Sequence, residues 1–240
     1  MRVVAIIPAR WGSTRFPGKP LAPIAGKPMI AHVWEKASAA DGIDAVIVAT
    51  DDPRIADAVI GFGGEVAMTR SDHLSGSDRL AEAAARIDAD VVINLQGDEP
   101  LVRPADLAAL AALMRAEPAV EVASLCHAID AGEAANPNRV KVVRDAQGNA
   151  LYFSRAPIPY PRDVAVARYF QHLGVYAYRR AALLAFSTLT VPAEECAESL
   201  EQLRFLAAGI EIRVIEVEPT GPGVDTPEDV TRVERILAGL

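Results

Sequence analysis

The sequence has few cysteines, no excess of basic residues and no long apolar run. Its two cysteines, Cys126 and Cys196, lack the spacing of a metal site, so we expect them to be reduced and structural. No apolar stretch could span a bilayer, and the N-terminus shows no signal-peptide pattern. We therefore expect a cytoplasmic protein without a membrane partner. The formal net charge of −8 argues against nucleic acid as a partner.

Two common phosphate-binding motifs are also missing. A P-loop requires Gly, four residues and then Gly-Lys-Ser/Thr, but five residues separate Gly12 from Gly18. Pro20 follows Lys19 and provides neither the N–H nor the hydroxyl that a P-loop uses. The dinucleotide pattern G-x-G-x-x-G is not present either. A phosphate in this loop would be bound by side-chain cations, and metal ligands would come from elsewhere.

The loop after the first apolar run carries the strongest functional signal. Residues 3–7 are predicted to form a buried strand. The loop that follows holds Arg10, Arg15 and Lys19, together with glycines that let backbone N–H groups approach an anion. Ligands of α/β proteins usually bind after such strands. We interpret the loop as a triphosphate site, and a solvated basic turn is the alternative.

Strand and helix signals alternate through the first half of the chain. A helix opening at Pro28, a strand at 46–49 and a helix capped by Asp52 predict a doubly wound, mostly parallel α/β sheet of the Rossmann type. The alternation stops after a strand at 122–125. A hairpin signal at 140–154 then predicts a smaller, mixed β layer in the second half.

Two adjacent carboxylates follow the apolar run at 91–96. Gly97 permits a sharp exit from this strand, and Pro100 fixes the turn that holds Asp98 and Glu99. Such carboxylates lie where α/β sheets bind ligands, and one well-placed aspartate can hold Mg²⁺ with phosphate oxygens. We favour Asp98 as the metal ligand, and an acidic surface turn is the alternative.

Polar positions elsewhere are less specific. The loop 69–77 leads into a helix and is either a polar ligand site or an ordinary capped loop. The run 171–178 alternates, and a lone strand histidine there is usually structural. Asp225 precedes a capping box at 226–229, and its carboxylate either stabilises the turn there or binds a metal. Further expectations are a shared helix face for Glu198, Glu201 and Gln202 and a final helix that buries Val230, Val233, Ile236 and Leu237.

Taken together, these segments resemble the 3-deoxy-manno-octulosonate cytidylyltransferase (CMP-Kdo synthetase) family. The resemblance extends over nearly the whole chain and rests on residues 8–21, 94–100, 152–156, 172–174 and 223–229. It implies a nucleotide-diphospho-sugar transferase fold and the reaction of CTP with 3-deoxy-D-manno-octulosonate (Kdo) to give CMP-Kdo and diphosphate. It also implies Mg²⁺ as cofactor, a homodimer and a role in lipopolysaccharide biosynthesis.

The resemblance assigns roles to individual residues. The implied nucleotide site comprises Pro8, Ala9, Arg10, Ser13, Arg15, Lys19, Arg70, His73, Ser75, Gln96 and Asp98. Within it the implied catalytic groups are Arg10, Arg15, Lys19 and Asp98. The implied sugar site comprises Gln96, Arg155, His172, Tyr176, Glu201 and Gln202, and the implied metal ligands are Asp98 and Asp225. The corresponding domains are a nucleotide-binding core at 1–130, a sugar-binding and dimerisation subdomain at 131–215, and a returning C-terminal loop and helix at 216–240.

Three alternatives stay open. The first is another nucleotidyltransferase, of the CMP-sialic acid or 8-amino-Kdo type or one that activates a sugar phosphate. The span from Arg155 to His172 is short beside typical family members and leaves the sugar preference open. The second is a dinucleotide-dependent oxidoreductase, which the missing glycine pattern disfavours. The third is a non-catalytic nucleotide-binding module, which the candidate metal aspartates disfavour.

Overall fold

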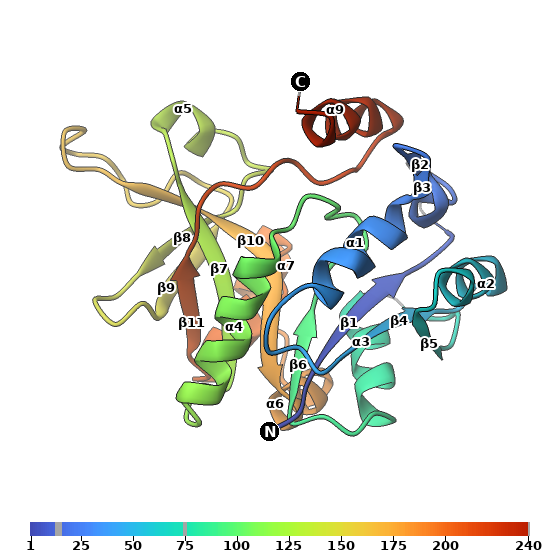
Figure 1. Ribbon diagram of the computed structural model, residues 1–240. Helices are drawn as coiled ribbons and strands as arrows, with labels where there is room; N and C mark the ends of the chain where they lie inside the picture. Colours follow the sequence, from blue (N-terminus) through green and yellow to red (C-terminus); the bar gives the residue numbers. More distant parts are fainter. Residues whose placement is uncertain (13–15, 74–75, 240) are drawn as a thin grey trace. The chain divides into compact units, whose positions relative to one another are not determined.

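The computed structural model describes residues 1–12, 16–73 and 76–239, and its contacts divide the chain into two compact units (Figure 1). The first unit comprises Met1–Ala112 and Thr220–Leu240, and the second comprises Leu113–Pro219. The first boundary thus falls near residue 112, before the strand that begins at Val122. None of the helices in the described ranges is long and apolar enough to cross a membrane.

Four parallel strands in the order β6-β1-β4-β5 form the sheet of the first unit. They are β1 (Val3–Ala9), β4 (Ala45–Thr50), β5 (Glu65–Met68) and β6 (Val91–Asn94). The chain runs outward from β1 through β4 to β5 and then returns to the other side of β1 to form β6. Such a reversal creates a crevice at the carboxyl ends of the two flanking strands, where open α/β sheets bind ligands. The predicted doubly wound core is confirmed, although β5 was not anticipated.

Helices connect these strands. The first unit contains η1 (Lys19–Leu21), the short strands β2 (Pro23–Ile24) and β3 (Lys27–Pro28), α1 (Met29–Ser38), α2 (Pro53–Gly61), α3 (Gly76–Ala85) and α9 (Pro227–Leu237), and α4 (Pro104–Ala116) crosses the unit boundary. By the rule that such crossovers are right-handed, the strand order puts α1 and α2 on one face of the sheet and α3 on the other. Asp52 caps α2 as predicted. Pro28 does not occupy the first helical position; it is the N-cap of α1, in an extended conformation.

The C-terminal segment packs into the core of the first unit. Val224 and Val233 are buried against Ile24 and Met29, which lie beside η1 and at the start of α1. The predicted capping box of α9 is present between Thr226 and Asp229. The prediction that α9 buries Ile236 and Leu237 is wrong, because these side chains are 43% and 37% exposed.

The second unit holds the predicted mixed β layer. Its strands are β7 (Val122–Ile129), β8 (Lys141–Arg144), β9 (Ala150–Ser154), β10 (Tyr169–Arg179) and β11 (Ile212–Glu216). Strand β7 pairs in parallel with β11 and antiparallel with β10, and β8 and β9 form the expected hairpin. The helices are α5 (Ala131–Ala134), α6 (Arg180–Ala185), η2 (Phe186–Thr188), α7 (Ala193–Glu198) and α8 (Leu203–Ala207).

One predicted helix of the second unit is interrupted. Glu198 ends α7, and Ser199 then adopts a left-handed conformation with φ of 51°. Glu201 and Gln202 lie in the turn before α8. The expectation that Glu198, Glu201 and Gln202 share one helix face is therefore wrong, because the helix ends at Glu198 and the next helix begins only at Leu203.

Strand β10 carries a row of aromatic rings in the second unit. The rings of His172 and Tyr176 lie 5.2 Å apart, so they share a face although a bulge interrupts the register between Leu173 and Tyr176. His172 Nε2 lies 2.9 Å from Ser124 Oγ, and the same hydroxyl lies 2.9 Å from the Val175 carbonyl oxygen. Burial lowers the pKa of His172 from 6.5 to about 3.

This burial predicts an acid-sensitive second unit. Between about pH 6.5 and pH 3 the unfolded chain binds a proton at His172 that the folded chain excludes. The stabilisation is complete above the unfolded pKa and is lost as the pH falls, by up to about 1.4 kcal/mol per pH unit. Urea unfolding followed at the tyrosine band of the near-ultraviolet circular dichroism reports this unit when the tryptophan fluorescence of the first unit is recorded alongside, because all five tyrosines lie in the second unit and both tryptophans in the first. His172→Gln should have a shallower pH dependence than the wild type, and equal slopes would contradict the prediction.

Candidate functional site

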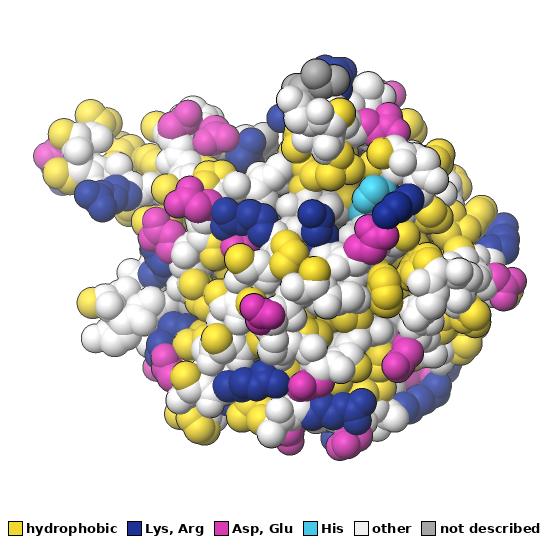
Figure 2. Space-filling model, in the orientation of Figure 1, with side chains coloured by type: hydrophobic (Ala, Val, Ile, Leu, Met, Phe, Trp, Pro, Cys, Tyr) yellow, Lys and Arg dark blue, Asp and Glu magenta, His cyan; other side chains and the backbone are white. Residues whose placement is uncertain are grey.

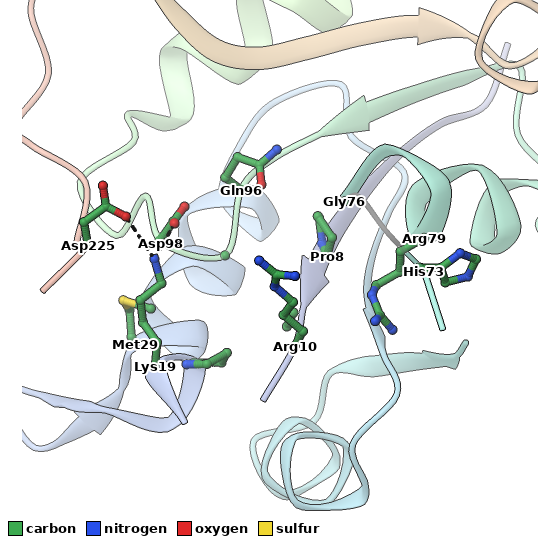
Figure 3. A pocket seen from close by; sticks show the side chains of 13 residues that line it. Pro8, Arg10, Lys19, Met29, His73, Gly76, Arg79, Gln96, Asp98 and Asp225 are labelled. Atoms are coloured by element: carbon green, nitrogen blue, oxygen red, sulfur yellow. Dashed lines mark hydrogen bonds and ion pairs between the residues drawn. The ribbon is translucent and has the colours of Figure 1, made fainter. Parts of the chain in front are cut away.

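A cavity of about 260 Å³ lies in the first unit at the carboxyl ends of β1 and β6 (Figure 3). It is lined by Pro8, Ala9, Arg10, Lys19, Pro20, Met29, His73, Gly76, Arg79, Gln96, Gly97, Asp98 and Asp225. This is the crevice that the reversal of strand order creates. The topology therefore accounts for the position of the cavity before any side chain is considered.

Lys19 joins the two predicted metal aspartates. Its Nζ lies 2.6 Å from Asp98 Oδ2 and 3.5 Å from Asp225 Oδ1, and it donates to the Val224 carbonyl at 2.8 Å. The Lys19 side chain is only 14% exposed, so these contacts replace most of its hydration. Figure 3 shows both aspartates directed at the one ammonium group. Two acids separated by more than half the chain thus face a single cation.

The backbone before Lys19 is fixed by a tight turn. Gly18 has φ of 73° and donates its N–H to the Trp11 carbonyl at 3.0 Å. A β-carbon on Gly18 would lie 3.0 Å from the Trp11 indole, so both conformation and space require glycine. The Arg54 guanidinium stacks on Trp11 at 3.4 Å from the ring centroid, and Asp52 holds that guanidinium through both carboxylate oxygens. Helix α2 thereby supports the turn that presents Lys19.

Asp98 and Asp225 are held in place by their main chains. Gly97 approaches β1 so closely that a β-carbon would lie 3.0 Å from the Pro8 carbonyl oxygen. The buried Val224 donates its N–H to the Asp98 carbonyl at 2.9 Å. The Asp225 N–H donates to the Asp229 carboxylate of the α9 capping box at 2.9 Å. The returning C-terminal segment is thus tied to the turn after β6 at the position of the two aspartates.

A third carboxylate lies beside this group. The pKa of Glu99 is raised from 4.5 to about 7, chiefly by burial and then by the charges of Asp98 and Asp225, while the charge of Lys19 lowers it. Within the described ranges, no group of three or more His, Cys, Asp or Glu side chains has the arrangement of a metal site. Two carboxylates with room for phosphate oxygens are nevertheless a donor set that Mg²⁺ accepts.

Cations line the remainder of the cavity. The chain carries a net charge of −8, and acidic and basic side chains are interspersed over the face shown in Figure 2. In the cavity, by contrast, Arg10, Lys19 and Arg79 converge. In Figure 3 the Arg10 side chain lies between the Lys19–aspartate group and Arg79. This local excess of positive charge suits a polyanionic ligand in an otherwise acidic protein.

Arg79 was missed from the sequence. Its side chain is 4% exposed, its Nη2 lies 3.2 Å from Asp51 Oδ2, and its Nη1 donates to the Thr69 hydroxyl. Asp51 and Thr69 follow β4 and β5 directly, so Arg79 joins the carboxyl ends of both strands to α3. The sequence signal that could have indicated Arg79 is its position one turn into a helix that follows a polar loop.

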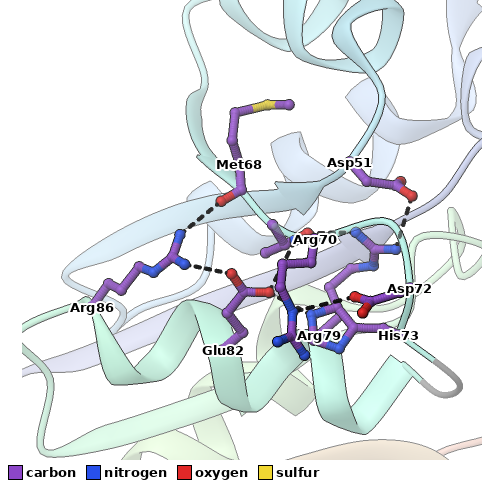
Figure 4. A network of polar contacts seen from close by, with 9 residues as sticks. Asp51, Met68, Arg70, Asp72, His73, Arg79, Glu82 and Arg86 are labelled. Carbon is purple, nitrogen blue, oxygen red and sulfur yellow. Dashed lines mark hydrogen bonds and ion pairs between the residues drawn. The ribbon is translucent and has the colours of Figure 1, made fainter.

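Glu82 organises the loop before α3 (Figure 4). Its carboxylate accepts hydrogen bonds from the Arg70 N–H at 3.0 Å and from the Arg86 guanidinium at 2.5 Å, and it also binds His73 Nε2. The Arg70 N–H and the His73 side chain lower the pKa of Glu82. The His73 side chain is only 6% exposed, and its Nε2 is paired with this carboxylate. The Arg70 side chain points to Asp72 instead and does not line the cavity.

The predicted nucleotide residues thus fall into three groups. Those that the cavity brings together are Pro8, Ala9, Arg10, Lys19, His73, Gln96 and Asp98, joined by Asp225. Arg70 lies outside the cavity lining. Ser13, Arg15 and Ser75 lie outside the described residues.

The predicted sugar residues other than Gln96 all belong to the second unit. Arg155 donates to the carbonyls of Glu198, Pro137 and Ser199, at 2.6, 3.2 and 3.4 Å. His172, Tyr176 and Gln202 are buried, whereas Glu201 is exposed. In the second unit Arg155 is therefore held by main-chain contacts, and His172 and Tyr176 are held by aromatic packing.

The known proteins that this chain resembles include cytidylyltransferases that act on octulosonic acids. A family model described as cytidylyltransferase matches residues 4–212. A 3-deoxy-manno-octulosonate cytidylyltransferase of Escherichia coli is 56% identical over 237 residues, which cover 99% of this chain and 96% of that protein. An 8-amino-3,8-dideoxy-manno-octulosonate cytidylyltransferase of Shewanella amazonensis is 50% identical over 242 residues, with 99% of each covered. A solved CMP:2-keto-3-deoxy-manno-octonic acid synthetase complexed with CTP superposes with a TM-score of 0.98 at 56% identity, covering 100% of this chain and 99% of that one.

The contacts of Glu82 generate a prediction for the loop that it holds. Glu82→Ala leaves the Arg70 N–H and His73 without their acceptor and should lower the free energy of unfolding by about 2 kcal/mol. Tryptophan fluorescence reports the first unit, because Trp11 and Trp34 both lie in it. Amide exchange at Arg70 should accelerate in parallel. Arg86→Met, which removes only the exposed partner, should cost under about 1 kcal/mol. Unchanged exchange at Arg70 in Glu82→Ala would contradict the assignment.

Proposed function

Because the chain belongs to the 3-deoxy-manno-octulosonate cytidylyltransferase family, we propose that it transfers CMP from CTP to Kdo. The anomeric hydroxyl of Kdo attacks the α-phosphorus of CTP in line, and the products are CMP-Kdo and diphosphate. The observation that best supports this proposal is the convergence of Arg10, Lys19, Asp98 and Asp225 in one cavity at the carboxyl ends of β1 and β6.

The cations of the cavity bind and orient the triphosphate. Lys19 and, by family resemblance, Arg15 neutralise the β- and γ-phosphates and stabilise the departing diphosphate. Arg10 supports the nucleotide near the α-phosphate, where charge develops as the bond to the leaving group breaks. These groups act by orienting the substrate and neutralising its charge. The rate therefore depends on how rigidly the turn at Gly18 fixes their positions.

No covalent intermediate with the protein is proposed. The described residues that line the cavity include no serine, threonine or cysteine. The only lining imidazole, among those residues, is His73, which is bound to Glu82. A nucleophile activated by a neighbouring base is thus not found within this described lining. Direct attack by the sugar hydroxyl requires none.

Magnesium is the cofactor that these residues would hold. Asp98 and Asp225 direct carboxylate oxygens at one point, and Mg²⁺ prefers one or two carboxylates together with phosphate oxygens. When bound, the metal would act as a Lewis acid and template at the α-phosphate. Asp98 and Asp225 would fix its position relative to Arg10.

The second unit is proposed to carry the sugar contacts and the subunit interface. Arg155, His172, Tyr176, Glu201 and Gln202 are the proposed sugar residues, together with Gln96 of the first unit. The segment after β9 exposes Tyr160, Val164 and Val166, which are 83%, 80% and 73% exposed. These apolar groups support a homodimer, which equilibrium sedimentation can test. A cytoplasmic location and a role in lipopolysaccharide biosynthesis are proposed on the same family grounds.

The sugar preference can be measured directly. Diphosphate release from CTP should be fastest, as kcat/KM, with Kdo, slower with its 8-amino analogue and at background with sialic acid. The analogue is the specific alternative, because a relative described as acting on it is 50% identical to this chain. A higher kcat/KM for the analogue would reassign the substrate, and background rates with both sugars would contradict the proposed function.

The metal assignment predicts the effect of one conservative substitution. Asp98→Asn keeps the size of the side chain but removes the charge that would bind the cation. Turnover at saturating Mg²⁺ should fall on the order of 10²-fold or more, as in the loss of a transition-state charge stabiliser. Asp57→Asn, at an exposed position of α2, is the matched control and should retain normal turnover. A near-normal rate of diphosphate release in Asp98→Asn would rule out this role for Asp98.

A further inference from the structure

We propose that Lys19 is a built-in substitute for the metal, whose ammonium group occupies the point shared by Asp98 and Asp225 until a nucleotide draws it away. The proposal rests on the metal ligands assigned above and adds an order of binding to them. A divalent cation alone binds this protein weakly, because its position is already held by a charge of the same sign. The metal and the nucleotide therefore enter together.

The contacts of the ammonium group carry the proposal. A metal shared by Asp98 and Asp225 would take one oxygen from each, and Oδ2 of the first and Oδ1 of the second already face Lys19 Nζ at 2.6 and 3.5 Å. The third donor of the ammonium is used by the Val224 carbonyl at 2.8 Å. An ammonium group has three donors, so this one is fully matched by acceptors in a side chain that is 14% exposed.

Size and charge make the two occupants exclusive. Magnesium binds oxygen at about 2.0–2.1 Å, so an ion held by the same two carboxylate oxygens would lie close to the ammonium nitrogen that they already contact. Like charges at such a separation repel strongly in a partly buried site, where water screens them less than in bulk. The lysine must leave before a cation can bridge the aspartates.

The same cavity provides the place to which the lysine moves. Lysine carries its charge on a flexible four-carbon stem, so the ammonium can swing while the turn at Gly18 stays fixed. Arg10 lines the same cavity and marks where anionic oxygens gather. When a nucleotide–metal complex enters, Lys19 exchanges the aspartates for phosphate oxygens and the metal takes the aspartates. Each carboxylate keeps a cation throughout the exchange.

The test measures metal binding without catalysis. Binding of Mn²⁺ alone to the full-length protein, without nucleotide, is followed by electron paramagnetic resonance of the unbound ion. Lys19→Met should bind Mn²⁺ about tenfold or more tighter than the wild type, within the range typical of coupling between two ligands. Lys19→Gln, which retains a donor for the Val224 carbonyl, should show the same direction and guards against a folding defect in the first variant.

Two further variants locate the effect. Lys27→Met is the matched control, because Lys27 pairs with Glu35 at 2.6 Å away from the cavity lining, and it should bind Mn²⁺ like the wild type. The double variant Lys19→Met/Asp98→Asn should lose the gain in affinity. Raising the melting temperature with Mg²⁺ alone should succeed in Lys19→Met and fail in the wild type.

The outcomes separate this proposal from the proposed function. Unchanged or weaker Mn²⁺ binding in both Lys19 variants would overturn the exchange. The metal assignment would still stand if Asp98→Asn abolished Mn²⁺ binding in the presence of CTP. If Asp98→Asn left that binding intact, the assignment of Asp98 as a metal ligand would fail, and the exchange would fail with it.

Discussion

The structure around the cavity depends on the neutralisation of two carboxylates by one ammonium group. Asp98 and Asp225 lie close enough together to repel each other, and Lys19 stabilises both from a position between them. The Val224 carbonyl completes the coordination of the ammonium and comes from the residue next to Asp225. Three segments that are far apart in the sequence are thereby held together by one charge. The proposed site, which would hold a polyanion and a cation in one space, needs such a balance, because an unmatched buried charge of either sign would destabilise the fold.

The backbone brings these charges together with few special residues. The reversal of strand order around β1 opens the crevice, and Gly97 allows the turn after β6 to reach the end of β1. Gly18 sets the direction from which Lys19 enters. The capping box of α9 does more than begin a helix, because Asp229 also accepts the N–H of Asp225 and so fixes the second aspartate. The hydrogen bonds of Asp229 that cap helix α9 are thus also the ones that position Asp225.

Much of this could be predicted from the sequence, since it depends on local rules. An apolar run followed by a loop of cations and glycines gave the position of Lys19, and a strand ending at adjacent carboxylates gave Asp98. The partners of these groups could not be predicted, because Lys19 meets Asp225 across more than two hundred residues. Ser199 adopts a left-handed conformation where periodicity suggested a continuous helix. Arg79 was missed because its role comes from the ends of β4 and β5, which only the sheet brings together.

The return of the last segment to the first unit has a consequence for biosynthesis. Residues 220–240 pack with the first 112 residues, although the whole second unit lies between them in the chain. A ribosome delivers the strands of the nucleotide sheet early and the segment bearing Asp225 late. Until residues 220–240 have been synthesised, the nascent sheet therefore lacks both the valines that pack beside Met29 and one of the acids that balance Lys19. The crevice is complete only after this segment has been made, so a product that stops before residue 220 would lack Asp225 and would leave Lys19 with Asp98 as its only partner of this pair.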